Sequence, residues 1–309
     1  MIVVMQPGAT TEQIEAATER LGRFGFDVYK NSGVERVVLA AVGLHPDFDV
    51  RAAEAIEGVA EVHRITHGYR LAGRLWKPAP TVVHVAGAAF GGPSVPLVAV
   101  ADARGEPAAS ARAAREAGAA LVGVLHGGAG TPDVAAWTKA AHAEGLGLAF
   151  EVTDAAEVEA AGVADVLVVA PERMEAPRLL AALGRGTRPV FLYRSPSATV
   201  DEWLAAADAV LAGGNPNVVL VEAGLRTFET TTHRTLDLSA VPAVHARSHL
   251  PILVDPSRGT GVARKVAAMA RAAVAAGADG LVVDLAEPEA MAELMRGVRA
   301  VAAAVGRRA

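Results

Sequence analysis

The residues in this sequence that could carry chemistry are charged and aromatic side chains near the ends of short apolar runs. They are Asp102, Arg104, His126, Tyr193, Arg194, Glu222, Arg226, Arg234, Arg258 and Asp284. Arginine predominates among them, and its planar guanidinium binds carboxylates and phosphates through paired N–H groups. The set therefore predicts a pocket for a small anionic metabolite. The residues assigned to catalysis are Arg194, Arg226, Arg258 and Asp284, and the other six are assigned to substrate binding.

Each of these side chains also has a purely structural interpretation. Arg258 either contacts the ligand or forms an internal pair with Asp284 or Asp102. The two aspartates either transfer protons or balance the charge of Arg258. His126 stands beside the Gly-Gly-Ala-Gly sequence at 127–130. It is either a base or carboxylate anchor, or an ordinary surface histidine.

The residue types exclude several kinds of catalytic site. The chain has no cysteine, so disulfides, thiolate nucleophiles and cysteine-ligated metals are ruled out. No lysine ends an apolar run, which leaves a Schiff-base mechanism without a nucleophile, and no Ser-His-Asp arrangement stands out. A metal site of His126, Asp102 and Asp284 is an alternative. The set as a whole predicts neither a metal nor another cofactor.

The candidate residues need elements that bring the ends of the runs together. From residue 76 onward, short apolar runs alternate with alanine-rich amphipathic stretches, and the runs end near 102, 126, 153, 172, 195, 223, 257 and 286. This alternation predicts a (β/α)8 TIM barrel, with a doubly wound open sheet as the alternative. Active sites of such barrels lie at the carboxyl ends of the strands, where the candidate residues fall. Residues 81–92 are expected to form a hairpin that closes the barrel floor.

The first 75 residues have a different pattern. An apolar strand, a helix capped by Thr10 or Thr11, two alternating strands, a second helix and a final strand follow in order. This βαββαβ order is typical of a ferredoxin-like sandwich. The sequence therefore predicts a small α+β domain of the regulatory type at 1–75 and a barrel at 76–309.

Composition limits the partners of the chain. The net charge is −5 and aromatic residues make up 4%, which disfavours nucleic acid as a partner. No apolar run reaches the roughly 18 residues that a membrane-spanning helix needs, and the N-terminus lacks the basic and apolar regions of a signal peptide. We therefore expect a cytoplasmic protein that contacts neither nucleic acid nor a membrane.

Several motifs match one family of barrel enzymes. The sequence Glu-Ala-Gly-Leu-Arg-Thr-Phe-Glu at 222–229 is similar to that family's Glu-Arg-Gly-Ile-Arg-Thr-Phe-Glu, and 235–242 follows at the family spacing. The segments 249–257 and 272–281 resemble the family's seventh strand and the approach to its eighth, and 1–9 resembles its N-terminal domain. The chain thus resembles the type I 3-deoxy-arabino-heptulosonate 7-phosphate (DAHP) synthases of the beta subtype, which carry an N-terminal ferredoxin-like domain.

The resemblance implies condensation of phosphoenolpyruvate with erythrose 4-phosphate at a divalent metal bound by Cys, His, Glu and Asp. The family's Gly-Pro-Cys motif falls in 100–104, where no cysteine exists. The position of the metal-binding His is Arg258, and that of the Glu is Asp284. The last Asp falls near Glu293 or Leu294 without a clear counterpart. The chain is therefore interpreted as a divergent member that lacks the metal ligands.

The positions that bind the substrates in the family are altered only in part. The family's Lys-Pro-Arg-Thr-Ser loop is replaced by residues 126–132, and its catalytic lysine is replaced by Tyr193. The adjacent Arg194 is retained. Arg226, which in the family contacts the phosphate of phosphoenolpyruvate, is retained as well.

These changes lead to the hypothesis of a metal-independent enzyme that acts on an anionic shikimate-pathway metabolite. The specific expectation is a mutase-like rearrangement of chorismate, because that reaction needs fixed cations and no metal. Two alternatives stay open. One is a non-catalytic homologue that regulates a hetero-partner in aromatic amino acid biosynthesis, and the other is residual metal-dependent DAHP synthase activity. The family resemblance further implies a homo-oligomer, either a dimer or a tetramer.

Overall fold

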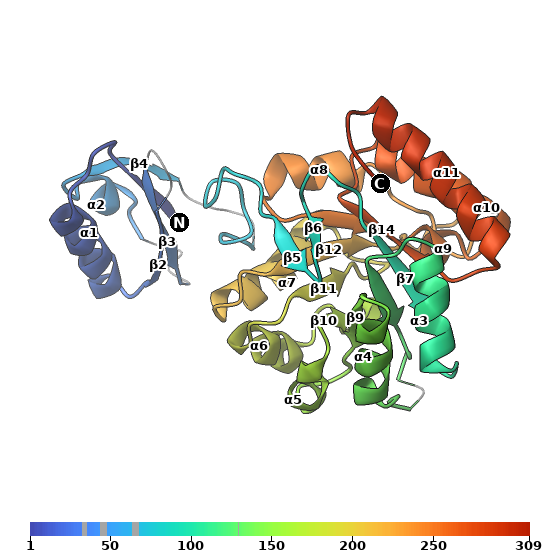
Figure 1. Cartoon of the computed structure of the whole chain (residues 1–309). Coiled ribbons are helices and arrows are strands. Elements are labelled where there is room, and N and C mark those ends of the chain that lie inside the picture. The colour runs from blue at the N-terminus through green and yellow to red at the C-terminus, as the bar shows by residue number, and fades with distance from the viewer. Residues whose placement is uncertain (33–35, 44–47, 64–67, 129) are drawn as a thin grey trace. The chain divides into compact units, whose positions relative to one another are not determined.

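The computed structural model describes residues 1–32, 36–43, 48–63, 68–128 and 130–309, which form two compact units (Figure 1). The first unit contains residues 1–79 together with 247–249. The short segment belongs there because the Ser248 hydroxyl donates a 2.6 Å hydrogen bond to the Ala72 carbonyl. The second unit contains residues 80–246 and 250–309.

The small unit is a four-stranded antiparallel sheet with two helices. Its elements are β1 (Ile2–Met5), α1 (Thr11–Arg23), β2 (Asp27–Ser32), β3 (Val37–Val42), α2 (Arg51–Glu54) and β4 (Val59–His63). The strand order is β2-β3-β1-β4. Thr10 caps α1: its hydroxyl accepts from the Gln13 backbone N–H, and the Gln13 side chain accepts from the Thr10 N–H. The predicted ferredoxin-like sandwich is confirmed.

The second unit is built on a closed parallel barrel. Its strands are β7 (Leu97–Ala101), β8 (Leu121–Val124), β9 (Gly147–Glu151), β10 (Val166–Val169), β11 (Val190–Tyr193), β12 (Val218–Glu222), β13 (Ile252–Val254) and β14 (Gly280–Asp284). Each strand pairs with the next, and β14 pairs with β7, which places Leu281 opposite Leu97. This last pairing closes the sheet, so the barrel is confirmed and the open-sheet alternative is wrong.

Helices follow the strands and surround the barrel (Figure 1). They are α3 (Pro107–Glu116), α4 (Val134–Ala143), α5 (Glu157–Ala160), α6 (Pro177–Arg185), α7 (Val200–Ala212), α8 (Ala240–Arg247), α10 (Ala263–Ala275) and α11 (Pro288–Ala304). A short additional helix, α9 (Pro256–Thr260), lies between β13 and α10. Among the described residues, no helix combines the length and apolar character needed to span a bilayer.

A hairpin of β5 (Val83–Val85) and β6 (Ala88–Phe90) packs against the amino ends of the barrel strands. Phe90 is fully buried, and its ring lies 5.2 Å from that of Phe191 in an edge-to-face contact. Val83 and Val85 belong to the same apolar cluster as the inward-facing barrel residues. The hairpin therefore fills the lower end of the barrel interior.

Two glycines allow α6 and α7 to approach each other closely. A Cβ built on Gly213 would stand 2.6 Å from the Cα of Gly184 and 2.7 Å from its carbonyl carbon. Both neighbours are backbone atoms, so they cannot move aside as a flexible side chain would. The close spacing of α6 and α7 at this point therefore depends on the absence of a side chain at Gly213 and Gly184.

We expect Gly213→Ala to lower the free energy of unfolding by about 1–3 kcal/mol, the usual cost of overpacking. Gly162 is a matched control, because a Cβ at that position meets nothing within 4 Å. Urea denaturation of both variants would measure the difference. Equal stabilities for Gly213→Ala and Gly162→Ala would show that the two helices lie further apart.

Candidate functional site

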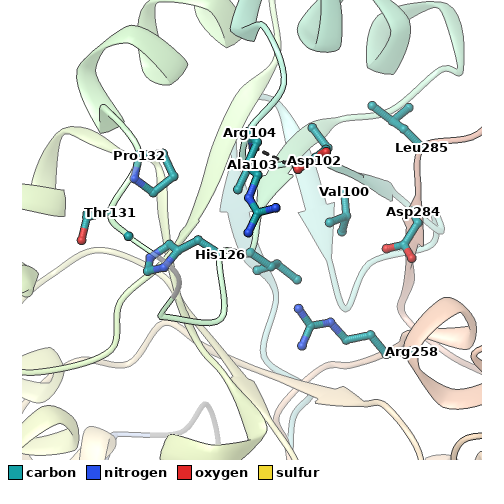
Figure 2. A pocket seen from close by; sticks show the side chains of 13 residues that line it. Val100, Asp102, Ala103, Arg104, His126, Thr131, Pro132, Arg258, Asp284 and Leu285 are labelled. Atoms are coloured by element: carbon teal, nitrogen blue, oxygen red, sulfur yellow. Dashed lines mark hydrogen bonds between the residues drawn. The ribbon is translucent and has the colours of Figure 1, made fainter.

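A cavity of about 720 Å³ opens at the carboxyl ends of β7, β8 and β14. It is lined by Val100, Ala101, Asp102, Ala103, Arg104, Leu125, His126, Gly130, Thr131, Pro132, Arg258, Asp284 and Leu285. Figure 2 shows the guanidinium groups of Arg104 and Arg258 pointing into the space between them, with His126 and Asp284 on opposite sides. Half of the ten predicted site residues therefore meet here: Asp102, Arg104, His126, Arg258 and Asp284.

Arg258 is held by the start of α9. Asp255 is the N-cap residue of that helix, and its Oδ1 accepts a 2.9 Å hydrogen bond from the Arg258 backbone N–H. Its Oδ2 accepts a 3.1 Å hydrogen bond from the Tyr193 hydroxyl and lies 3.9 Å from Nε of Arg258. The Arg258 guanidinium also lies 5.6 Å from the centre of the Tyr193 ring. Among the described residues, Asp255 is thus the acid at ion-pair distance from Arg258, whereas Asp284 and Asp102 were the internal partners left open as an alternative to ligand contact.

The sequence analysis did not assign Asp255 to the site, although a signal for it exists. An Asp-Pro-Ser sequence directly after a buried strand is typical of a helix N-terminus with an aspartate cap and proline in the first turn. Thr131 and Pro132 also line the cavity. They belong to the segment 126–132 that replaces the family's substrate loop, although neither was assigned to the site individually, and Ala129 in that segment lies outside the described residues.

Burial dominates the titration of the acids around Arg258. Complete burial raises the pKa of Asp255 to about 6, although the N–H and charge of Arg258 oppose the shift. Enclosure in the cavity raises the pKa of Asp284 too, again against the attraction of Arg258. Burial alone would lower the pKa of Arg258, but Tyr193, Asp255 and the other nearby acids raise it. The guanidinium is therefore a permanent cation in this pocket.

Asp255→Asn should flatten the dependence of stability on pH. Between about pH 4 and 6 the folded protein keeps a proton on Asp255 that the unfolded chain has lost, so ionisation at higher pH costs the folded state up to about 3 kcal/mol. Stability from this group is present below pH 4 and is lost as the pH rises through 6. Urea denaturation of wild type and variant across this pH range would measure the free energy of unfolding. The same pH dependence in both proteins would contradict a raised pKa of Asp255. Asp133→Asn, at the exposed cap of α4, is the control.

His126 fastens the loop after β8 instead of standing free. Its Nδ1 accepts from the Gly128 N–H at 3.2 Å, so its Nε2 carries the proton and donates to the Glu151 carbonyl at 3.2 Å. The Glu151 carboxylate in turn accepts a 2.9 Å hydrogen bond from the Gly127 N–H. Both ring nitrogens are occupied, so His126 lines the cavity as a support and not as a free base.

Arg194 and Glu222 do not line the cavity. The Arg194 side chain is 5% exposed, and its Nη1 lies 3.1 Å from Glu222 and 2.9 Å from Asp237. Glu222 is fully buried, which raises its pKa, while Arg194 opposes the shift. The Arg194 Nε donates to the Ala198 carbonyl. Against the expectation of substrate contacts, Arg194 and Glu222 form a buried ion pair, and Arg194 donates to Glu222, Asp237 and a backbone carbonyl.

Arg194→Met should destabilise the fold by about 3–5 kcal/mol, because it leaves Glu222 and Asp237 without their buried cation. The double variant Arg194→Met/Glu222→Gln should recover much of this loss, since the remaining amide needs no counter-charge. Chemical denaturation would measure both. A substrate-binding role for Arg194 predicts the opposite result, a weakened substrate affinity with unchanged stability.

Tyr193, Arg226 and Arg234 lie outside the cavity lining too. Tyr193 is buried in the barrel core and reaches the site only through Asp255. Arg226 is exposed on the loop after β12. Arg234 lies 3.5 Å from Glu172, and its Nη1 is buried without a hydrogen-bond partner among the described residues. Their assignment to the site stays a prediction.

The residues present do not fit the divalent metal that the family resemblance implies. Cysteine is absent, and a guanidinium stands where the histidine ligand would be. In the described parts of the chain, no group of three His, Asp or Glu side chains is arranged to hold a metal ion. Arg258 would repel a divalent cation placed beside it. The chemistry of the donor set thus disagrees with metal binding at this position.

The structure is that of a (β/α)8-barrel protein with an N-terminal ferredoxin-like unit and a charged cavity at the carboxyl ends of the barrel strands. Residues 124–300 match the DAHP synthetase I family, and residues 1–67 match the DAHP synthase ferredoxin-like domain. The first match alone covers more than half of the chain. The chain therefore belongs to the type I DAHP synthase family.

Individual relatives agree with this assignment. A phospho-2-dehydro-3-deoxyheptonate aldolase of Thermotoga maritima is 31% identical over 307 residues, covering 94% of this chain and 90% of the relative. The crystal structure of a phospho-2-dehydro-3-deoxyheptonate aldolase (DAHP synthase) from Thermotoga maritima superposes with a TM-score of 0.75 at 28% identity, covering 99% of this chain and 98% of the other. A truncated DAHP synthase from Thermotoga maritima has a TM-score of 0.74 at 28% identity and covers 78% of this chain and 99% of its own.

The hypothesis of a chorismate rearrangement is wrong. The relatives that cover nearly the whole chain are named as aldolases or DAHP synthases, and the family model matches the barrel over most of its length. The hypothesis rested on the cations that remain in the pocket, and such cations serve any reaction of an anionic substrate. The comparisons favour DAHP synthase activity, which the sequence left only as an alternative.

Proposed function

We propose that this chain condenses phosphoenolpyruvate with erythrose 4-phosphate in the manner of a DAHP synthase. The observation that carries the proposal is the similarity to a named aldolase across 94% of the chain, through both units. The cavity adds physical support. Its volume of about 720 Å³ suits small-molecule substrates, and its two arginines suit carboxylates and phosphates.

The reaction makes one carbon–carbon bond and, at C2 of phosphoenolpyruvate, replaces the bond to the phosphate oxygen by a bond to the oxygen of water. C3 of phosphoenolpyruvate bonds to the aldehyde carbon, and the electron pair of the aldehyde double bond moves to its oxygen, which takes up a proton. Water adds to C2 of the phosphoenolpyruvate portion, and inorganic phosphate leaves from the same carbon. The barrier falls when the reactants are held in contact and the developing charge on oxygen is stabilised.

The residues of the cavity can perform the binding and proton transfer that this reaction needs. Among the described residues, the guanidinium of Arg104 has no hydrogen-bond or ion-pair partner, so all its donors are available for a phosphate or carboxylate. Asp102 fixes the turn that carries it by accepting a 3.0 Å hydrogen bond from the Arg104 backbone N–H. Asp284 lines the same cavity and is the acid placed to exchange a proton with a bound substrate; burial raises the pKa of its carboxyl and Arg258 opposes the shift.

We expect the purified chain to release phosphate from phosphoenolpyruvate only when erythrose 4-phosphate is present, with the seven-carbon product visible by NMR. Arg104→Met should lower kcat/KM by about 10- to 100-fold, since a hydrogen-bonded charge contact is lost. Arg112→Met is the matched control, because Arg112 is exposed on α3 outside the cavity. The assay is run in EDTA and again with Mn²⁺.

The absence of product in both metal conditions would overturn the proposed function. It would favour the alternative of a non-catalytic homologue that regulates an enzyme of aromatic biosynthesis. The lost metal ligands are the observation that makes this alternative worth testing. An equal loss of activity in Arg112→Met and Arg104→Met would move the site away from the cavity.

A further inference from the structure

The guanidinium of Arg258 is the most constrained charge in the cavity. It is 29% exposed and is directed into the open space between β7, β8 and β14, as Figure 2 shows. Its backbone is fixed by the cap hydrogen bond to Asp255, and its planar group rests over the ring of Tyr193. The long side chain therefore has little freedom to leave this position.

Negative charge surrounds this one cation. The acids that act on the guanidinium come from three places in the fold: Glu151 ends β9, Asp255 caps α9 and Asp284 ends β14. Asp284 is further tied to α9, because its backbone N–H donates a 3.0 Å hydrogen bond to the Ser257 hydroxyl. These acids thus surround a cation that belongs to the chain itself, and Asp255 lies at ion-pair distance from it.

We propose that Arg258 is the resident cation of this site and takes the place of a divalent metal, with its N–H groups holding the aldehyde oxygen of the substrate as negative charge develops there. This role rests on the proposed function. A guanidinium stays charged at all relevant pH values, cannot be removed by a chelator, and presents fixed donors to an oxygen. Its own charge excludes Mn²⁺ from the same space.

The first test is a calorimetric titration of the EDTA-treated and desalted wild type with MnCl₂. We expect no stoichiometric uptake. Uptake of one equivalent of Mn²⁺ would overturn the proposal, because metal and guanidinium cannot share the position. This titration does not depend on turnover, so it gives a result even if the proposed reaction fails.

The second test compares turnover in EDTA of Arg258→Met, Arg258→Lys and the wild type. Loss of a donor to a developing oxyanion lowers kcat by about 100-fold or more. The effect should fall on kcat rather than on KM for phosphoenolpyruvate, and the lysine variant should recover part of it. Arg264→Met is the charge-matched control on α10 and should retain activity, since Arg264 is exposed and does not line the cavity of about 720 Å³.

The outcomes separate this proposal from the proposed function. A wild type that turns over only when Mn²⁺ is supplied, or an Arg258→Met variant with the full kcat, would overturn the role of Arg258 while leaving the reaction in place. Thermal melting of each variant shows whether a loss reflects unfolding, and partial rescue by lysine excludes that explanation. If no condition gives turnover, the proposed reaction is overturned. The Mn²⁺ titration then shows by itself whether Arg258 or a metal ion is the cation of the site.

Discussion

One buried carboxylate, Asp255, determines the geometry of the barrel mouth. It follows β13 directly, caps α9, accepts a hydrogen bond from the Tyr193 hydroxyl and balances the guanidinium of Arg258. A buried acid without these partners would be neutral and would leave the arginine free to turn toward solvent. The position of the cation, the start of α9 and, through the Ser257 hydroxyl, the backbone of Asp284 all depend on this one side chain.

The fold could be predicted almost completely from the sequence. Buried parallel strands must be apolar on both faces, so each appears in the sequence as a short continuous apolar run. The end of each run lies within a few residues of the end of the observed strand. The N-terminal order of strands and helices was equally clear, because the capping box at Thr10 and Gln13 and the alternating strands are local signals. Closure of the barrel followed from the number of units, although the sequence contains no direct mark of the pairing between β14 and β7.

The site could be predicted only in part, for a physical reason. The rule that chemistry lies at the carboxyl ends of strands selects a layer of residues, but it does not say which way each side chain turns. Arg194 and Arg258 both follow strands, yet Arg194 turns inward to Glu222 and Asp237 whereas Arg258 faces the cavity. The choice depends on acids contributed by β12 and by the loop that follows it, at sequence separations of 28 and 43 residues. Such pairings are set by the closed barrel and not by local sequence.

The hairpin at the lower end of the barrel is joined to the floor of the cavity by packed side chains. Phe90, Val83 and Val85 lie in one apolar cluster with the inward-facing strand residues, and this cluster includes Val100 and contacts Leu125, which line the cavity. Closely packed interiors have little room to absorb a change in side-chain volume. A substitution in the hairpin can therefore shift the floor of the cavity without touching anything bound there.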